Sequence, residues 1–123
     1  KGIIVIGTIS GDMHDLGKNL VIRTLESAGF KVIDLGVDVP TEKFISAAKE
    51  EKADIVAIST LLTTTMVHMK DVITGLRADS DLKDVKVLVG GSPLDDEYAA
   101  KMGADAYGEN VVDALRKAQE LIS

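Results

Sequence analysis

A polar segment near the start of the chain, from Gly11 to Asn19 (GDMHDLGKN), carries the side chains best suited to chemistry. It holds His14, one of the two histidines in the chain, with carboxylates at Asp12 and Asp15. Histidine is the commonest metal ligand in proteins, and a carboxylate on its second ring nitrogen fixes the tautomer and raises the basicity of the ring. Asp12 can play that part for His14, because residues two apart on an extended segment point the same way. The segment therefore predicts a metal ligand at His14, against the plainer interpretation of a solvated loop with an incidental histidine.

Two apolar stretches position this segment. Residues 3–6 predict a buried strand over 2–8, and residues 20–25 predict the inner face of a helix over 17–28, which Gly29 ends. In open α/β sheets, ligands bind beyond the carboxyl ends of the strands. A polar loop that leaves the end of the first strand is therefore a candidate binding site.

The rest of the chain repeats this alternation of strand and helix. Further strands are predicted over 31–35, 54–59, 85–89 and 104–107, and further helices over 41–51, 65–78, 95–102 and 110–122. The pattern indicates a single α/β domain over 1–123, a doubly wound, flavodoxin- or Rossmann-like sheet of five parallel strands in the order 2-1-3-4-5. Thr41 is expected to cap the second helix. The last helix is expected to turn inward its apolar residues Val111, Val112, Leu115, Ala118, Leu121 and Ile122.

The switch point of that strand order lies between the first and third strands. The His14 loop and a hydroxyl-rich run from Ser59 to Thr65 would flank one crevice there, with Gly90 and Gly91 at the same rim. A glycine pair after a strand leaves room for a ligand, although it also serves as an ordinary turn. The threonine hydroxyls can bond a polar ligand, although they also suit the start of a helix.

Composition narrows the classes of function. The 123 residues carry 14 basic and 20 acidic side chains, and the net charge of −6 argues against nucleic acid as the main partner. Without cysteine, the chain has neither disulfides nor thiolate metal sites. It has no signal peptide and no apolar run of membrane-spanning length, so a cytoplasmic location without membrane contact is expected. It also has neither a dinucleotide-binding glycine motif nor a Walker loop for phosphate.

The motifs together are far more specific than each alone, and they resemble those of the cobalamin-binding domains that hold B12 in the base-off/His-on state. The matching residues are Asp12, His14 and Gly17, then Ser59 and Leu61, then Gly90 and Gly91. The spacing agrees as well, with 41 residues (18–58) between the first two motifs and 28 (62–89) between the last two. The run over 11–19 looks most like the methyl-transferring branch, which includes methionine synthase and the corrinoid proteins of methylamine, methanol and methoxyarene metabolism.

The resemblance implies a cofactor, cobalamin or a related cobamide, and a role for each matching residue. His14 would bind the cobalt, and Asp12 would bond the other nitrogen of the ring. The hydroxyl of Thr65 would support Asp12, where methionine synthase usually has serine. No catalytic side chain beyond the cobalt is implied. The other implied cofactor contacts are Gly11, Met13, Asp15, Leu16 and Gly17 in the loop, Ser59, Leu61 and Thr63 along the nucleotide tail, Gly90 and Gly91 leaving room for it, and Ala106 and Tyr107 near its base.

By the same resemblance, the chain would be a corrinoid protein that carries a methyl group on cobalt. Its partners would be a substrate:corrinoid methyltransferase and an acceptor methyltransferase, the final acceptor being tetrahydrofolate or a thiol. A helical cap domain usually precedes this domain in such carriers, and the abrupt start at Lys1 leads us to expect that it is missing here. The alternatives are the B12-binding domain of a carbon-skeleton mutase, a B12-sensing regulatory module, and a receiver-like module without a corrinoid.

Overall fold

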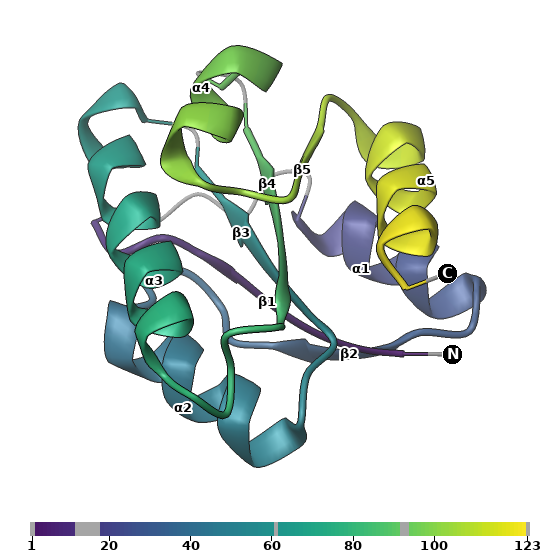
Figure 1. The fold of residues 1–123 in the computed structure, drawn as a ribbon. Helices are drawn as coiled ribbons and strands as arrows, with labels where there is room; N and C mark the ends of the chain where they lie inside the picture. The colour runs from purple at the N-terminus through teal and green to yellow at the C-terminus, as the bar shows by residue number, and fades with distance from the viewer. Residues whose placement is uncertain (1, 12–17, 61, 92–93, 123) are drawn as a thin grey trace.

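Strands and helices alternate along the chain, as the apolar runs predict (Figure 1). The computed structural model describes residues 2–11, 18–60, 62–91 and 94–122. The strands are β1 (Ile3–Thr8), β2 (Lys31–Asp34), β3 (Ile55–Ser59), β4 (Lys86–Gly90) and β5 (Ala106–Gly108). The helices are α1 (Lys18–Ser27), α2 (Thr41–Glu51), α3 (Met66–Ala78), α4 (Asp96–Met102) and α5 (Val111–Leu121), with a 3₁₀ turn, η1 (Thr63–Thr65), ahead of α3.

The strands form one parallel sheet in the order β2-β1-β3-β4-β5, which confirms the predicted topology. Thr8 of β1 pairs with Ser59 of β3, and Ser59 pairs with Gly90 of β4, so these three residues lie side by side at the carboxyl edge. Hydrogen bonding continues past this edge, because the amide of Ile9 donates to the Ser59 carbonyl and the amide of Thr60 donates to the Gly90 carbonyl. The loops that leave β1, β3 and β4 therefore begin next to one another.

Helices cover both faces of the sheet (Figure 1). α1 and α5 pack on one face, and α2, α3 and α4 pack on the other. Because β1 is buried on both sides, its sequence is a continuous apolar run rather than an alternating one. On the α2 side, the ring of Phe44 is fully buried and lies so close to Gly7 of β1 that a Cβ at Gly7 would be 3.1 Å from it. No helix in the described ranges is both long and apolar enough to cross a membrane.

The start of α2 differs from the prediction that Thr41 caps it. The residue before the helix is Pro40, in an extended conformation (φ −74°, ψ 159°), and no side chain caps the helix. Proline has a fixed φ and no amide hydrogen. It suits the start of a helix, because an amide hydrogen there would have no partner within the helix. Thr41 is instead the first helical residue. The predicted end of α1 is confirmed, because Gly29 adopts a left-handed conformation (φ 97°).

The end of the chain contains two further differences. Val112 was expected to face the core, but 76% of it is exposed. The helical period brings Ala114 and Ala118 onto the buried face of α5 and leaves Val112 outside it. The fifth strand was expected over 104–107 but spans Ala106–Gly108, because pairing with β4 begins only where Ala106 meets Leu88.

Replacing Phe44 with alanine should lower the free energy of unfolding by about 3–5 kcal/mol, because it opens a cavity in a fully buried position. Urea unfolding followed by circular dichroism measures this change. Val112→Ala is the matched control and should change stability by less than about 0.5 kcal/mol, because the side chain is mostly exposed. Equal effects of the two substitutions would contradict the assignment of the core.

Candidate functional site

A cavity of about 200 Å³ lies at the carboxyl edge of the sheet, on the face covered by α1 and α5. The strands supply its floor, and the first turns of the two helices supply its walls. Its polar groups are few against a mostly apolar surface, as is usual for a site that takes an organic ligand. The lining residues are Ile6, Lys18, Val21, Ala57, Ile58, Ser59, Thr60, Leu88, Val89, Gly90, Gly91, Gly108, Glu109, Asn110, Val111 and Ala114.

The two adjacent glycines of the third motif both line this cavity, but the structure constrains them differently. A Cβ on Gly90 would meet nothing closer than the Gly108 carbonyl oxygen at 3.4 Å, which is ordinary contact. A Cβ on Gly91 would lie 1.8 Å from the carbonyl oxygen of Thr60, and Gly91 also has a φ of +140°. Gly91 is therefore required by the close approach of two backbones, whereas Gly90 leaves space that the fold itself does not need.

The residues on either side of the polar loop are held by carboxylates from β2, which lies beside β1 in the sheet, and from its connection to α2. Where the described chain resumes, the buried side chain of Lys18 donates from Nζ to the two carboxylate oxygens of Asp34, at 2.9 and 3.0 Å. Before the loop, the amide of Gly11 donates to the carboxylate of Asp38 at 2.6 Å. A buried ammonium needs such a partner, so the pair fixes the start of α1 against the end of β2.

Sequence reasoning did not single out Lys18, Asp34 or Asp38. The available signal was topological, because β2 neighbours β1 in the predicted order and the two carboxylates follow its apolar residues. Charged residues at the ends of neighbouring parallel strands meet at one edge, which would have made them candidates.

Hydroxyl groups lie at the carboxyl ends of β1 and β3 and on the residues that follow β3. Thr8 and Ser59 are joined by their hydroxyl oxygens at 3.1 Å. Thr65 is buried, and its methyl group lies 3.1 Å from the position of a Cβ on Gly11. Its side chain is thus adjacent to the residue before Asp12. Thr63, in contrast, is exposed on η1 and does not line the cavity.

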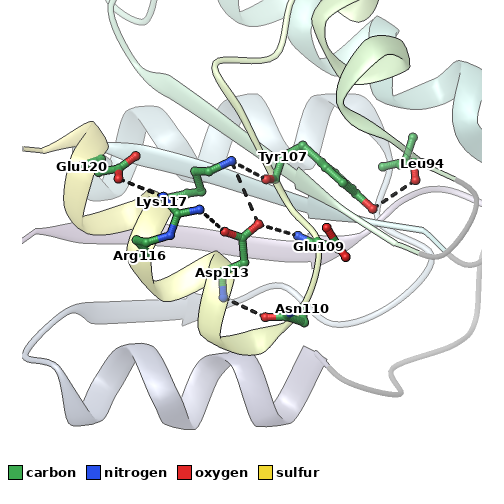
Figure 2. Close-up of polar contacts among 8 residues, drawn as sticks. All are labelled: Leu94, Tyr107, Glu109, Asn110, Asp113, Arg116, Lys117 and Glu120. Carbon is green, nitrogen blue, oxygen red and sulfur yellow. Dashed lines mark hydrogen bonds and ion pairs between the residues drawn. The ribbon is translucent and has the colours of Figure 1, made fainter.

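The resemblance implies that Ala106 and Tyr107 of β5 lie near the base of the nucleotide tail, and Figure 2 shows the contacts of Tyr107. Ala106 and Tyr107 line a second cavity, which lies between α4 and α5, and not the first. The Tyr107 hydroxyl donates to the Leu94 carbonyl at 3.0 Å, and burial, together with nearby acidic groups, chiefly Glu109, raises the pKa of Tyr107. The residues after β5, namely Glu109, Asn110 and Val111, line the first cavity.

The start of α5 is fixed by two hydrogen bonds that join Asp113 to the two residues before the helix (Figure 2). The amide of Asp113 donates to the side-chain oxygen of Asn110 at 2.8 Å, and the amide of Glu109 donates to the Asp113 carboxylate at 2.9 Å. The bond from Glu109, assisted by the guanidinium of Arg116, holds the pKa of Asp113 below its usual value. Asn110 caps the helix, so this arrangement sets one wall of the cavity.

Of the residues expected at the site, Ser59, Gly90 and Gly91 are brought together around the cavity, with Gly11 and Thr65 in contact beside it. Seven others lie outside the described residues: Asp12, Met13, His14, Asp15, Leu16, Gly17 and Leu61.

Alanine at the two glycines should separate their roles in the chain without ligand. Gly91→Ala should lower the free energy of unfolding by about 3 kcal/mol, because the added methyl group collides with the Thr60 backbone. Gly90→Ala should change it by less than about 1 kcal/mol, because the new methyl group makes only ordinary contact. Chemical denaturation of both variants checks this. A Gly90→Ala chain that is as unstable as Gly91→Ala would contradict the packing described here.

Replacing Asp113 with asparagine should flatten the loss of stability in acid. Because the folded state holds the pKa of Asp113 below its value in the unfolded chain, the unfolded chain binds the proton more readily. The stabilisation is therefore present above the unfolded pKa, near 3.8, and is lost as the pH falls through the lower folded value. Thermal unfolding from pH 6 to about pH 3 should show a steeper fall in Tm for the wild type than for Asp113→Asn. Parallel curves would contradict the role of this carboxylate.

Comparison with known proteins agrees with this geometry. The model of the B12 binding domain family matches residues 2–116. Dimethylamine corrinoid protein 2 of Methanosarcina acetivorans is 49% identical over 121 residues, which cover 98% of this chain and 56% of that protein. The chain thus spans about half the length of this relative.

Solved structures have the same fold at more than 30% identity. A cobalamin-binding protein from Desulfitobacterium hafniense DCB-2 superposes with a TM-score of 0.94 at 34% identity, over 100% of this chain and 60% of that one. The methanol:cobalamin methyltransferase complex MtaBC from Methanosarcina barkeri gives a TM-score of 0.92 at 33% identity, over 98% of this chain and 46% of that one. With a family model that matches nearly all of its residues, the chain belongs to the B12-binding domain family.

Proposed function

We propose that the chain is the cofactor-carrying domain of a corrinoid protein, which accepts a methyl group from one methyltransferase and presents it to another. The observation that carries the proposal is the cavity at the carboxyl edge of the sheet, where Ser59, Gly90 and Gly91 of two separate motifs meet. The motif of Asp12, His14 and Gly17 follows Gly11 in the chain, and Gly11 lies beside Thr65 at the same edge. Identity of 49% to a dimethylamine corrinoid protein favours the methyl-carrier branch over mutase domains and regulators.

The described residues fit the parts of a cobamide. Its nucleotide tail ends in a flat aromatic base, and the cavity offers apolar walls and a floor of backbone at Gly90 and Gly108. Its corrin ring is a wide, largely apolar macrocycle. Three large hydrophobic side chains are exposed in the first turns of α1, α3 and α5, and these turns surround the carboxyl edge: Leu20, Val67 and Val112. Such a rim suits a flat ligand or the partner that lies over it.

The chain's own residues hold and orient the cofactor. When bound, the corrinoid supplies the cobalt on which the methyl group is accepted and released. His14 would be the axial ligand, Asp12 would fix its tautomer, and Thr65 would donate to Asp12. The bonds of Lys18 to Asp34 and of Gly11 to Asp38 would hold the two ends of the segment that carries these groups.

The partners would be a substrate:corrinoid methyltransferase and an acceptor methyltransferase. We favour a methylamine as the methyl donor, because a dimethylamine and a trimethylamine corrinoid protein of Methanosarcina acetivorans are 49% and 46% identical to this chain. That complex is also a precedent for a related domain held against its methyltransferase.

The experiment is electron paramagnetic resonance of the chain loaded with cobalamin and reduced to cobalt(II). One nitrogen should couple to the cobalt, and labelling the protein's histidines with ¹⁵N should change that splitting, because the ligand is His14. His14→Ala should abolish the labelled coupling and weaken cobalamin binding by about tenfold or more. His68→Ala is the control and should behave as the wild type, because His68 is an exposed residue of α3 that faces Asp71.

If the nitrogen splitting does not change with the ¹⁵N label, the coupled nitrogen belongs to the cofactor's own base. That result would contradict the base-off/His-on state. The methyl-carrier role is tested separately, by adding a methylamine methyltransferase and its substrate and following the visible spectrum. A loaded chain that no such enzyme methylates would contradict the methylamine assignment.

A further inference from the structure

Tyr107 reaches from the edge strand β5 to the connection between β4 and α4 (Figure 2). Its hydroxyl donates to the carbonyl of Leu94 at 3.0 Å. Burial, together with nearby acidic groups, chiefly Glu109, raises the pKa of Tyr107, so the hydroxyl keeps the proton that this bond needs. A side chain that lines the second cavity thus holds the backbone of a different connection.

The backbone of Tyr107 is held on two sides. It pairs with Val89 in the sheet, and Nζ of Lys117 on α5 donates to its carbonyl at 3.0 Å. The same ammonium lies 4.0 Å from the carboxylate of Asp113. The ring therefore extends from a fixed point toward Leu94.

Leu94 links Tyr107 to the first cavity. Its amide donates to the carbonyl of Gly91 at 3.1 Å, and Gly91 lines that cavity. Only 5% of Leu94 is exposed, so water has little access to replace a lost partner of its backbone. Two hydrogen bonds in series thus lead from the Tyr107 hydroxyl, outside the first cavity, to a residue in its wall.

Gly91 cannot move without changing that wall. A Cβ at this position would lie 1.8 Å from the carbonyl oxygen of Thr60, so the two backbones are in close contact. Thr60 also lines the cavity, and its amide donates to the carbonyl of Gly90 at 3.1 Å. Close-packed groups transmit displacements to their neighbours. A shift of Gly91 would therefore alter the shape of the cavity.

We propose that Tyr107 is a positioning residue for the nucleotide tail of the corrinoid, which acts from outside the first cavity by holding Leu94 and, through it, the wall at Gly91. This inference rests on the proposed function, in which the tail occupies that cavity. It follows that Tyr107 affects the binding of a corrinoid that has the tail and leaves unchanged the binding of one that lacks it.

The test compares the dissociation constants of methylcobalamin and of methylcobinamide, which lacks the nucleotide tail, by titration of the ligand-free chain. Tyr107→Phe keeps the ring and removes the hydroxyl. It should lower the preference for methylcobalamin over methylcobinamide by about three- to tenfold, the effect of roughly one hydrogen bond. Gly90→Ala, which places a methyl group in the same cavity, should lower this preference as well.

Tyr98→Phe is the matched control and should keep the wild-type preference. Tyr98 is the other tyrosine of the chain and lies on α4, and it is not among the described residues that line either cavity.

Amide hydrogen exchange in the ligand-free chain gives a second measurement. Without the Tyr107 hydroxyl, the bond from the Leu94 amide to Gly91 should open more often, so exchange at Leu94 should become about threefold faster or more. The amide of Asp113, which donates to Asn110 at the start of α5, should exchange at the wild-type rate and serves as the internal control.

A wild-type preference in Tyr107→Phe, or unchanged exchange at Leu94, would overturn the inference and leave the proposed function intact. Equal losses of affinity for both corrinoids, or faster exchange at Asp113 as well, would also overturn it, because they would reflect a general loss of stability. A wild-type chain that shows no preference for methylcobalamin would instead contradict the proposed function, in which the tail is bound in the cavity.

Discussion

The parallel register of β1, β3 and β4 is the constraint on which the site depends. It places Thr8, Ser59 and Gly90 in one row at the carboxyl edge. The connections that follow β1, β3 and β4 therefore begin side by side, although tens of residues separate them in the chain. A register shift of one residue in any of these strands would turn the wrong side chains toward the cavity. The apolar faces of the strands prevent such a shift, because both sides of β1 and β3 are buried under helices. Packing of the core thus determines the geometry of the site, because several residues that line the cavity, such as Ile6, Ile58 and Val89, belong to that core.

The polar loop after β1 is held at its ends by charge. Asp38 bonds the last described amide before it, and Asp34 holds the buried ammonium of Lys18 where the described chain resumes. Both carboxylates come from the end of β2 and the connection that follows, which lies beside β1 in the sheet. This arrangement keeps Gly11 and Lys18, the described residues on either side of the segment, in place against the end of β2 and the connection that follows it.

The architecture was predictable because its signals are local. Runs of β-branched residues, helical periodicity and the position of Gly29 each report on nearby backbone, and the strand order follows from general rules of α/β sheets. The predictions for Thr41 and Val112 were wrong. The role of Thr41 depends on the residue at which α2 begins, and that of Val112 depends on which side of α5 faces the sheet. The ion pair of Lys18 and Asp34 is a contact through space between side chains of separate elements, and no spacing in the sequence encodes it. The placement of Ala106 and Tyr107 around a different cavity likewise follows from the packing of α4 and α5.

The two glycines at the end of β4 meet different requirements, although they are neighbours in the chain. Gly91 is imposed by the fold, since the backbone of Thr60 occupies the space of any side chain there, and Gly90 leaves a volume that only a ligand would use. Natural selection would therefore act on them independently. In a descendant that had lost its cofactor, position 91 would remain glycine, whereas larger residues would replace Gly90. The substitutions at this pair would therefore indicate whether a lineage still binds a corrinoid.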